Sequence, residues 1–250
     1  MIKTFIKTPA FITLGISSDK GKKKFSLIPV ALYDNLLFKK INERKIKIIR
    51  ESGYKIPTND LNPIYKTVLL LQNLKPNKLG AEIRIKKNIP SFSGLNSGIS
   101  NAAGALISLN KLWGFNLSKQ NIIKIGSQID PKMAQILNFY YKPSRYKIKN
   151  AILVRPKYIK IEKDWLDNKL KKTKKTSQNP YEQLIYKYFP DIKEIAGFLR
   201  KNGCDISGVS EKGPIIYGLS EKSLDNKKIK NSLIEKIDFI WIGKSCNKLG

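Results

Sequence analysis

The sequence predicts an α+β fold of two lobes in which a Ser- and Gly-rich loop joins a strand to a helix. Before this loop, residues 81–87 alternate between apolar and basic side chains, as a strand with one buried face does. After it, apolar residues between positions 102 and 113 recur at spacings of three and four, which indicates a helix that Gly114 ends. The loop itself, IPSFSGLNSGISNAA at residues 89–103, is where we expect a functional site.

The remaining segments predict a boundary near residue 150, with an N-terminal domain over 1–150 and a C-terminal domain over 151–250. In the first we expect strands at 5–16 and 25–31, a turn at 17–24, and helices at 64–74, 117–126 and 132–137. In the second we expect strands at 151–161, 214–219 and 239–242, and helices at 181–188 and 192–202. Residues 165–177 are polar and basic, which favours an irregular connector.

The composition excludes several kinds of chemistry. The chain has no histidine and two cysteines, Cys204 and Cys246, so a histidine–cysteine zinc site, a Ser-His-Asp triad and histidine acid–base catalysis are ruled out. The cysteines are expected to be reduced, buried thiols. The 250 residues suffice for a substantial core, and they show neither an apolar stretch of membrane-spanning length nor a signal-peptide pattern. We therefore expect a cytoplasmic protein.

The net charge of +29 comes almost entirely from lysine, since only six of the 48 basic residues are arginines. Nucleic-acid sites favour arginine, whose planar guanidinium makes paired hydrogen bonds. The lysines are spread along the chain, which favours a solvated basic surface without a dedicated polyanionic partner. Attraction of anionic substrates and nonspecific contact with nucleic acid remain the alternatives.

The loop has the features of an anion-binding site. A strand, a Gly/Ser loop and the first turn of a helix direct unpaired backbone N–H groups and the positive end of the helix dipole toward a ligand. Gly94 and Gly98 allow close approach of the backbone, and the hydroxyls of Ser93, Ser97 and Ser100 can reach phosphate oxygens or a bound Mg²⁺. No Gly-Lys-Ser/Thr follows, so this is not a Walker loop. From these residues alone an ordinary tight turn is the favoured alternative.

Short motifs run in a consistent order along most of the chain. At the loop they are Lys87-Asn88-Ile89-Pro90, Gly94-Leu95, Gly98, Ser100, Ala102-Ala103 and Leu109-Asn110. Elsewhere they are Thr8-Pro9-Ala10, Asn62, Tyr65-Lys66, Asn179, Glu182, Phe189-Pro190-Asp191, Val209-Ser210 and Gly213-Pro214. Together these motifs resemble those of the GHMP kinase family. Within the family they most resemble the branch that phosphorylates a cytidine-diphosphate-linked methylerythritol in non-mevalonate isoprenoid biosynthesis.

The resemblance implies a two-lobed GHMP kinase fold and ATP-dependent phosphorylation of a hydroxyl on a small anionic substrate of the cytidine diphosphate type. It also implies ATP and Mg²⁺ as cofactors and no membrane partner, and it leaves the oligomeric state open. The residues that it places at the nucleotide are Pro90, Ser93, Gly94, Leu95, Asn96, Ser97, Gly98 and Ser100, with Ser100 also expected as a metal ligand.

The departures from the family pattern fall on its catalytic positions. Phe11 stands where the family has a lysine after Pro-Ala, and a phenyl ring cannot stabilise negative charge as a cation does. Without gaps, Gln128 stands at the position of the family's catalytic aspartate, and an amide cannot take a proton. A two-residue shift makes Asp130 the candidate base, although a helix cap or turn before Pro131 is the favoured alternative for it. For the missing cation, Lys7 and Lys124 are candidates.

In the loop, Phe92, Asn96 and Ser97 replace glycines of the family pattern, Ile99 replaces a serine and Asn101 replaces an aspartate. In a C-terminal glycine motif, Glu211 and Lys212 stand where the pattern has glycine and serine. Two hypotheses follow. Either the chain is a working kinase in which another basic residue replaces the lost lysine, or it is a catalytically degenerate relative that binds nucleotide, RNA or a protein partner without turnover. A basic nucleic-acid binder is a third, weaker hypothesis, which predicts binding that weakens steeply with salt.

Overall fold

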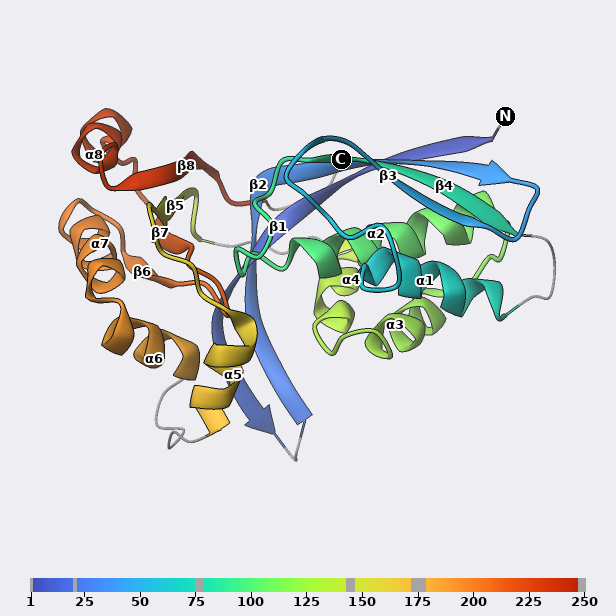
Figure 1. The fold of residues 1–250 in the computed structure, drawn as a ribbon, viewed down its shortest axis with the longest axis horizontal. Coiled ribbons are helices and arrows are strands. Elements are labelled where there is room, and N and C mark those ends of the chain that lie inside the picture. Colours follow the sequence, from blue (N-terminus) through green and yellow to red (C-terminus); the bar gives the residue numbers. More distant parts are fainter. Residues whose placement is uncertain (1, 20–21, 75–78, 143–146, 172–178, 247–250) are drawn as a thin grey trace.

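The structure of the chain is a computed structural model, and it describes residues 2–19, 22–74, 79–142, 147–171 and 179–246. Two four-stranded sheets occupy opposite ends of the molecule, and helices pack against each of them (Figure 1). The predicted α+β class is therefore confirmed. The loop at residues 88–96 joins a strand to a helix, as the sequence predicts.

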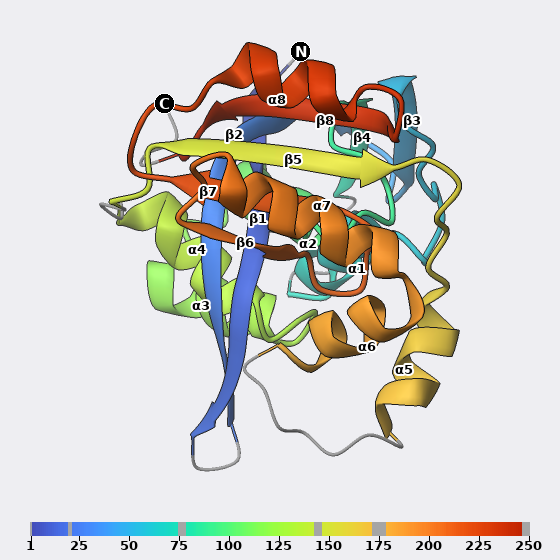
Figure 2. The same cartoon turned by 90° about the vertical axis from the view of Figure 1, so that its left-hand side faces the viewer.

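The N-terminal sheet consists of β1 (Lys3–Asp19), β2 (Lys22–Ile41), β4 (Gly80–Lys87) and β3 (Ile46–Gly53), in that spatial order. β3 runs parallel to β4, and the other neighbours are antiparallel. The predicted alternation in β4 is confirmed, because Ile83 and Ile85 are buried while Lys86 is exposed. β1 and β2 continue beyond this sheet as a long hairpin (Figures 1 and 2).

Four helices lie on one face of this sheet (Figure 1): α1 (Pro63–Gln72), α2 (Ser97–Leu112), α3 (Lys119–Ser127) and α4 (Met133–Tyr141). α1 begins at a side-chain cap, because Asn62 Oδ1 accepts a hydrogen bond from the N–H of Ile64 at 3.0 Å. α2 packs against both β1 and β2. Its apolar stripe, which includes Leu106 and Leu109, is fully buried as the spacing of three and four predicts.

The C-terminal sheet consists of β6 (Ile206–Val209), β7 (Ile216–Ser220), β5 (Asn150–Pro156) and β8 (Ile237–Lys244), in that spatial order and antiparallel throughout. The helices of this end are α5 (Lys163–Lys171), α6 (Pro180–Tyr188), α7 (Pro190–Lys201) and α8 (Asn226–Leu233). The predicted helices near 181–188 and 192–202 are confirmed. Three described elements of this end were not predicted: the short strand β6 and the helices α5 and α8.

The prediction of an irregular connector over 165–177 is wrong for the part that the structure describes, where α5 forms instead. Leu166 is fully buried in the C-terminal core, and the ring of Trp165 packs edge-on against Tyr188 and Phe189 at centroid distances of 5.1 and 5.9 Å. Leu170 also packs against this core, so three apolar side chains hold a helix that is otherwise polar. The predicted turn at 17–24 is also too long, since residues 17–19 and 22–24 belong to β1 and β2.

Three apolar cores hold the chain together, one behind each sheet and a third between them. In the third core, Ala10, Ile12 and Val30 of β1 and β2 meet Leu153 of β5 and Tyr217 of β7. The division into domains over 1–150 and 151–250 stays a prediction, because this third core draws residues from both sides of the boundary.

Cys204 and Cys246 are both buried thiols that form no disulfide, as predicted. Burial raises the pKa of the Cys204 thiol to about 11, so it stays protonated near neutral pH. Across the described ranges, no helix combines the length and the apolar character that crossing a membrane requires.

Candidate active site

The loop between β4 and α2 takes a left-handed backbone conformation at three residues, Phe92 (φ 56°), Gly94 (φ 80°) and Asn96 (φ 53°). Asn96 directly precedes α2 but makes no capping hydrogen bond, and the first turn of α2 contains no acidic side chain. The N–H of Ser100 donates to the Asn96 carbonyl at 2.9 Å. The N–H groups of residues 97–99 lie ahead of it and have no helical acceptor. Together with the helix dipole they form an end that attracts anions.

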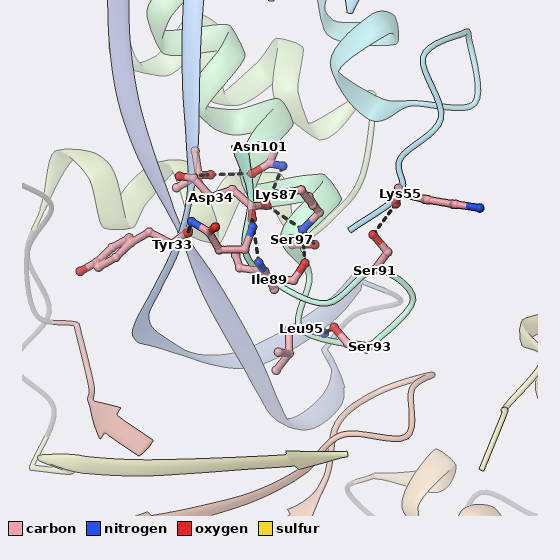
Figure 3. Close-up of polar contacts among 12 residues, drawn as sticks. Tyr33, Asp34, Lys55, Lys87, Ile89, Ser91, Ser93, Leu95, Ser97 and Asn101 are labelled. Carbon is pink, nitrogen blue, oxygen red and sulfur yellow. Dashed lines mark hydrogen bonds and ion pairs between the residues drawn. The ribbon is translucent and has the colours of Figure 1, made fainter. Parts of the chain in front are cut away.

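A buried ion pair supports the base of the loop (Figure 3). Lys87 is 3% exposed, and its Nζ lies 2.7 Å from Asp34 Oδ2, 2.5 Å from the Ile89 carbonyl and 3.1 Å from Ser97 Oγ. The other oxygen of Asp34 accepts the N–H groups of Asn88 and Ile89, each at 2.9 Å. Burial lowers the pKa of Lys87, and the charge of Asp34 opposes that shift. The pair ties the end of β4 to β2 and to the start of α2.

Asn101 completes this network and explains one departure from the family pattern. Its Nδ2 donates to Asp34 Oδ2 at 2.9 Å, and its Oδ1 accepts from Thr8 Oγ1 at 2.5 Å. An aspartate at position 101 would set a second buried carboxylate against Asp34, which repulsion between like charges disfavours. The amide at position 101 therefore suits the carboxylate at position 34.

Two of the three loop hydroxyls predicted to bind phosphate, those of Ser93 and Ser97, make hydrogen bonds inside the protein. Ser97 Oγ accepts from Lys87, and Ser93 Oγ accepts from the N–H of Leu95 at 3.4 Å. Ser100, the predicted metal ligand, is fully buried. Binding of ATP or a metal ion by this set stays a prediction. Of the predicted nucleotide residues, Pro90 and Leu95 are also buried, and the partly exposed ones are Gly94, Asn96 and Gly98.

The turn between β6 and β7 packs directly against the loop. Ser210 Oγ donates to the Ser93 carbonyl at 2.7 Å. A Cβ atom at Gly94 would strike the Glu211 carbonyl, and one at Gly213 would strike the backbone of Ser93. Glycine is needed at both positions because the two backbones touch there. The loop thus lies where the two ends of the molecule meet.

Position 11, where the resemblance expects a lysine, belongs to the apolar core. Phe11 is 2% exposed, and its ring meets the ring of Phe139 edge-on at a centroid distance of 5.6 Å. Its backbone remains at the loop, because the Phe11 carbonyl accepts from Asn96 Nδ2 at 2.9 Å. Both candidates for the missing cation, Lys7 and Lys124, are exposed.

A buried lysine that no motif marks lies at the loop. Lys132 is 8% exposed and directly precedes α4. Its Nζ forms an ion pair with Glu211 and lies 3.0 Å from Asn96 Oδ1. Thr13 Oγ1 lies 3.3 Å from the Glu211 carboxylate, to which it donates, and 3.1 Å from Asn96 Nδ2. These four side chains come from four separate segments, so sequence spacing could not reveal them as a group.

Asp130, the predicted base, makes the contacts of a turn. Its Oδ1 accepts from the N–H of Lys132 at 2.8 Å, and its carbonyl accepts from the N–H of Met133 at 3.0 Å. This is the arrangement that a residue before proline at a helix start adopts. The carboxylate is nevertheless partly exposed, and a catalytic role for it stays a prediction. Gln128 is exposed at the end of α3.

The chain resembles known kinases in both sequence and fold. Residues 62–138, from the cap of α1 to α4, match the family model described as GHMP kinases N terminal domain. A crystal structure of a 4-(cytidine 5'-diphospho)-2C-methyl-D-erythritol kinase superposes with a TM-score of 0.75 at 18% identity, covering 97% of this chain and 99% of the other. A homoserine kinase from Cytophaga hutchinsonii superposes with a TM-score of 0.68 at 13% identity, covering 98% and 96%. The chain therefore contains a GHMP kinase N-terminal domain over residues 62–138, and it shares the fold of these solved kinases.

Its curated relatives point to one branch of that family. The chain is 27% identical to a 4-diphosphocytidyl-2-C-methyl-D-erythritol kinase of Levilactobacillus brevis, over 91% of this chain and 93% of the relative. It is also 27% identical to the kinase of the same name from Clostridioides difficile, over 88% and 85%. The similarity therefore extends over most of the length of both proteins, which confirms the resemblance seen in the motifs.

Proposed function

We propose that the chain is an ATP-dependent kinase that phosphorylates a hydroxyl of a small anionic substrate of the cytidine diphosphate type. The uncapped N-terminus of α2, which opens on a loop with three left-handed residues, carries the proposal. Similarity to 4-diphosphocytidyl-2-C-methyl-D-erythritol kinases over 91% of the chain supports this substrate class and a place in isoprenoid biosynthesis. A cytoplasmic location belongs to the same proposal.

ATP suits this site because its phosphates are anionic and accept hydrogen bonds from backbone N–H groups. In the proposal, the partly exposed backbone at Gly94, Asn96 and Gly98 contacts the phosphates. Ser93 and Ser97 act indirectly, because their hydroxyls bond within the loop and to Lys87. Pro90 and Leu95 are buried and hold the loop in shape.

Mg²⁺ would arrive with ATP, since this ion is usually held by phosphate oxygens, waters and only one or two carboxylates. Among the described residues, no group of three or more His, Cys, Asp or Glu side chains could hold a metal ion by itself. Ser100 is fully buried, so the first turn of α2 must shift before its Oγ can reach an ion. The ion would neutralise charge on the phosphate oxygens.

In the proposed reaction, the substrate hydroxyl oxygen forms a bond to the γ-phosphorus of ATP. The bond from that phosphorus to the bridging oxygen breaks, and its electron pair leaves with ADP. The hydroxyl proton passes to a base, for which Asp130 is the candidate. Because phosphoryl transfer depends mainly on positioning and on stabilisation of charge, the loop and any cation beside it contribute more than the base.

Two measurements test the proposal. Calorimetry with Mg²⁺ and ATP asks whether the nucleotide binds, and an assay coupled to ADP release asks whether 4-diphosphocytidyl-2-C-methyl-D-erythritol is phosphorylated. If Asp130 is the base, Asp130→Asn lowers turnover by about 10²–10⁴-fold. If Asp130 only forms the turn, turnover is unchanged, because asparagine keeps the oxygen that accepts from Lys132. Lack of ATP binding by the unaltered protein refutes the kinase proposal.

The second candidate function is a degenerate relative that binds a nucleotide, RNA or a protein partner without turnover. Phe11 in the core and Gln128 at the surface favour it, since neither can do the work of a lysine or an aspartate. ATP binding without ADP release identifies this case. Retention on duplex DNA or RNA that falls steeply with salt identifies nonspecific nucleic-acid binding instead.

A further inference from the structure

We infer that Lys132 is the catalytic cation of this site and that Glu211 and Asn96 hold it in position. Lys132 thereby takes the role that the family pattern gives to a lysine at position 11. The inference rests on the proposed kinase function and deepens it, because it names a reacting group that no motif marks.

Burial is the first observation. Among the lysines whose side chains the structure describes, only Lys87 and Lys132 are buried, and both lie at the loop. Lysine leaves water at a large cost in free energy and is buried only where a partner or a function requires it. Lys87 has a structural explanation, because it braces the loop through Asp34. Lys132 needs another one, since a buried ion pair is in general a weak source of stability.

Position is the second observation. Asn96 Nδ2 donates to the carbonyl of Phe11 at 2.9 Å, and Asn96 Oδ1 accepts from Lys132 Nζ at 3.0 Å. One amide group therefore separates the ammonium of Lys132 from the backbone of position 11. The ammonium group belongs to a side chain at the start of α4 and not to one on β1. It still lies at the junction of β1 and the loop.

Three departures from the family pattern meet at this point, which is the third observation. Phe11 removes the expected cation, while Asn96 and Glu211 stand where the pattern has glycine. A glycine at either place has no side chain with which to hold the ammonium. Here Asn96 supplies one acceptor and Glu211 supplies the counter-ion from the turn between β6 and β7. The three changes together fit a move of the catalytic positive charge from position 11 to Lys132.

Charge stabilisation explains what the relocated group does. A phosphate at the N-terminus of α2 would meet the N–H groups of residues 97–99 on one side and the ammonium of Lys132 on another. During transfer, Lys132 stabilises the negative charge on the moving phosphoryl oxygens, and it neither gains nor loses a proton. Glu211 is a positioning residue: it orients the ammonium and is itself held by Thr13 at 3.3 Å.

The test compares Lys132→Met with Lys193→Met, which removes an equal charge from an exposed site on α7. For Lys132→Met we expect kcat to fall by about 10²–10³-fold, with little change in KM for the cytidyl substrate. Calorimetry should show that ATP loses affinity while ADP, which lacks the γ-phosphate, keeps it. Lys132→Arg keeps a positive charge and should retain clearly more activity than Lys132→Met. Lys193→Met should match the unaltered protein in all of these measurements.

A second pair of variants covers the case in which Lys132→Met fails to fold. Glu211→Gln keeps Lys132 but removes the counter-ion that orients its ammonium group. We expect kcat to fall by about tenfold while the preference for ATP over ADP remains. Lys132→Met combined with Glu211→Gln leaves no unpaired buried charge, and it should fold without turnover.

Several outcomes overturn the inference. One is a folded Lys132→Met with the kcat of Lys193→Met, and another is an equal loss of ATP and ADP affinity. A third is Lys132→Arg and Lys132→Met being equally inactive and equally unstable, which indicates a purely structural pair. If the unaltered protein binds ATP without turnover, kcat cannot be compared. The loss of affinity for ATP relative to ADP in Lys132→Met then tests the inference by itself. If it binds no ATP, the proposed function fails and the inference fails with it.

Discussion

The buried pair of Lys87 and Asp34 gives the sharpest prediction about stability. Lys87→Met keeps the length and apolar stem of the side chain and removes only the ammonium group. The change abolishes three contacts, with Asp34 Oδ2 at 2.7 Å, the Ile89 carbonyl at 2.5 Å and Ser97 Oγ at 3.1 Å. Asp34 is fully buried, so it is left as a carboxylate without a counter-ion.

The expected size of the effect follows from what Asp34 retains. Removing one partner of a buried ion pair costs about 3–5 kcal/mol. Asp34 keeps hydrogen bonds from the N–H groups of Asn88 and Ile89 and from Asn101 Nδ2, each at 2.9 Å. These three donors stabilise the remaining charge, which places the loss near the lower end, at about 3 kcal/mol. For a chain of this size, that loss lowers the melting temperature by roughly 6–12 °C.

Urea and thermal unfolding of Lys87→Met measure this loss, and Lys86→Met is the matched control because Lys86 is the exposed neighbour on β4. The control should stay within about 0.5 kcal/mol of the unaltered protein. Adding Asp34→Asn to Lys87→Met should recover part of the loss, since no charge is then buried alone. ATP affinity should fall with Lys87→Met as well, because Ser97 and the start of α2 lose their support.

This prediction is refuted if Lys87→Met unfolds at the same urea concentration as Lys86→Met. It is also refuted if Asp34→Asn makes Lys87→Met less stable still. Either result shows that the pair does not hold the base of the loop.

Two other predictions concern the same region. Asn101→Asp sets a carboxylate against Asp34 and removes the donor that now lies 2.9 Å from Oδ2, so we expect urea unfolding to show a loss of about 2–4 kcal/mol; an unchanged midpoint contradicts the network. Gly94→Ala combines a backbone strain at φ 80° with a collision against the Glu211 carbonyl, whereas Gly114→Ala, at φ 64°, meets open space. Gly114→Ala should lower the free energy of unfolding by only about 1–2 kcal/mol and leave ATP binding intact. Gly94→Ala should lower it by more and should also weaken ATP binding. Equal effects of the two changes contradict close contact at Gly94.

Local signals made the β4–loop–α2 unit predictable. Alternation in residues 81–87 arises because one face of the strand is buried, and the spacing of three and four after the loop arises because one stripe of the helix is buried. Each pattern is therefore visible within a single short stretch of sequence. α5 escaped prediction because it is polar except for Trp165, Leu166 and Leu170, whose burial depends on α6 and the C-terminal core. β6 escaped because it has four residues, too few for a clear alternation.

The directions of polar side chains in the loop could not be predicted in the same way. The sequence shows hydroxyls at positions 93, 97 and 100 but not their partners. Ser97 turns to Lys87, which lies ten positions before it, and Ser100 is enclosed within the packed helices. A hydroxyl can bond with a ligand or with the protein, and the nearest fixed donor decides which.

The sequence by itself indicated the resemblance to GHMP kinases, the loop frame at Pro90, Gly94 and Gly98, and the absence of the expected cation at position 11. Only the tertiary structure decided which of the many lysines lies at the loop, because Lys132 and Glu211 are 79 positions apart and meet through the packing of two sheets. A charge acts over a few ångströms, and the fold sets those distances without regard to spacing along the chain.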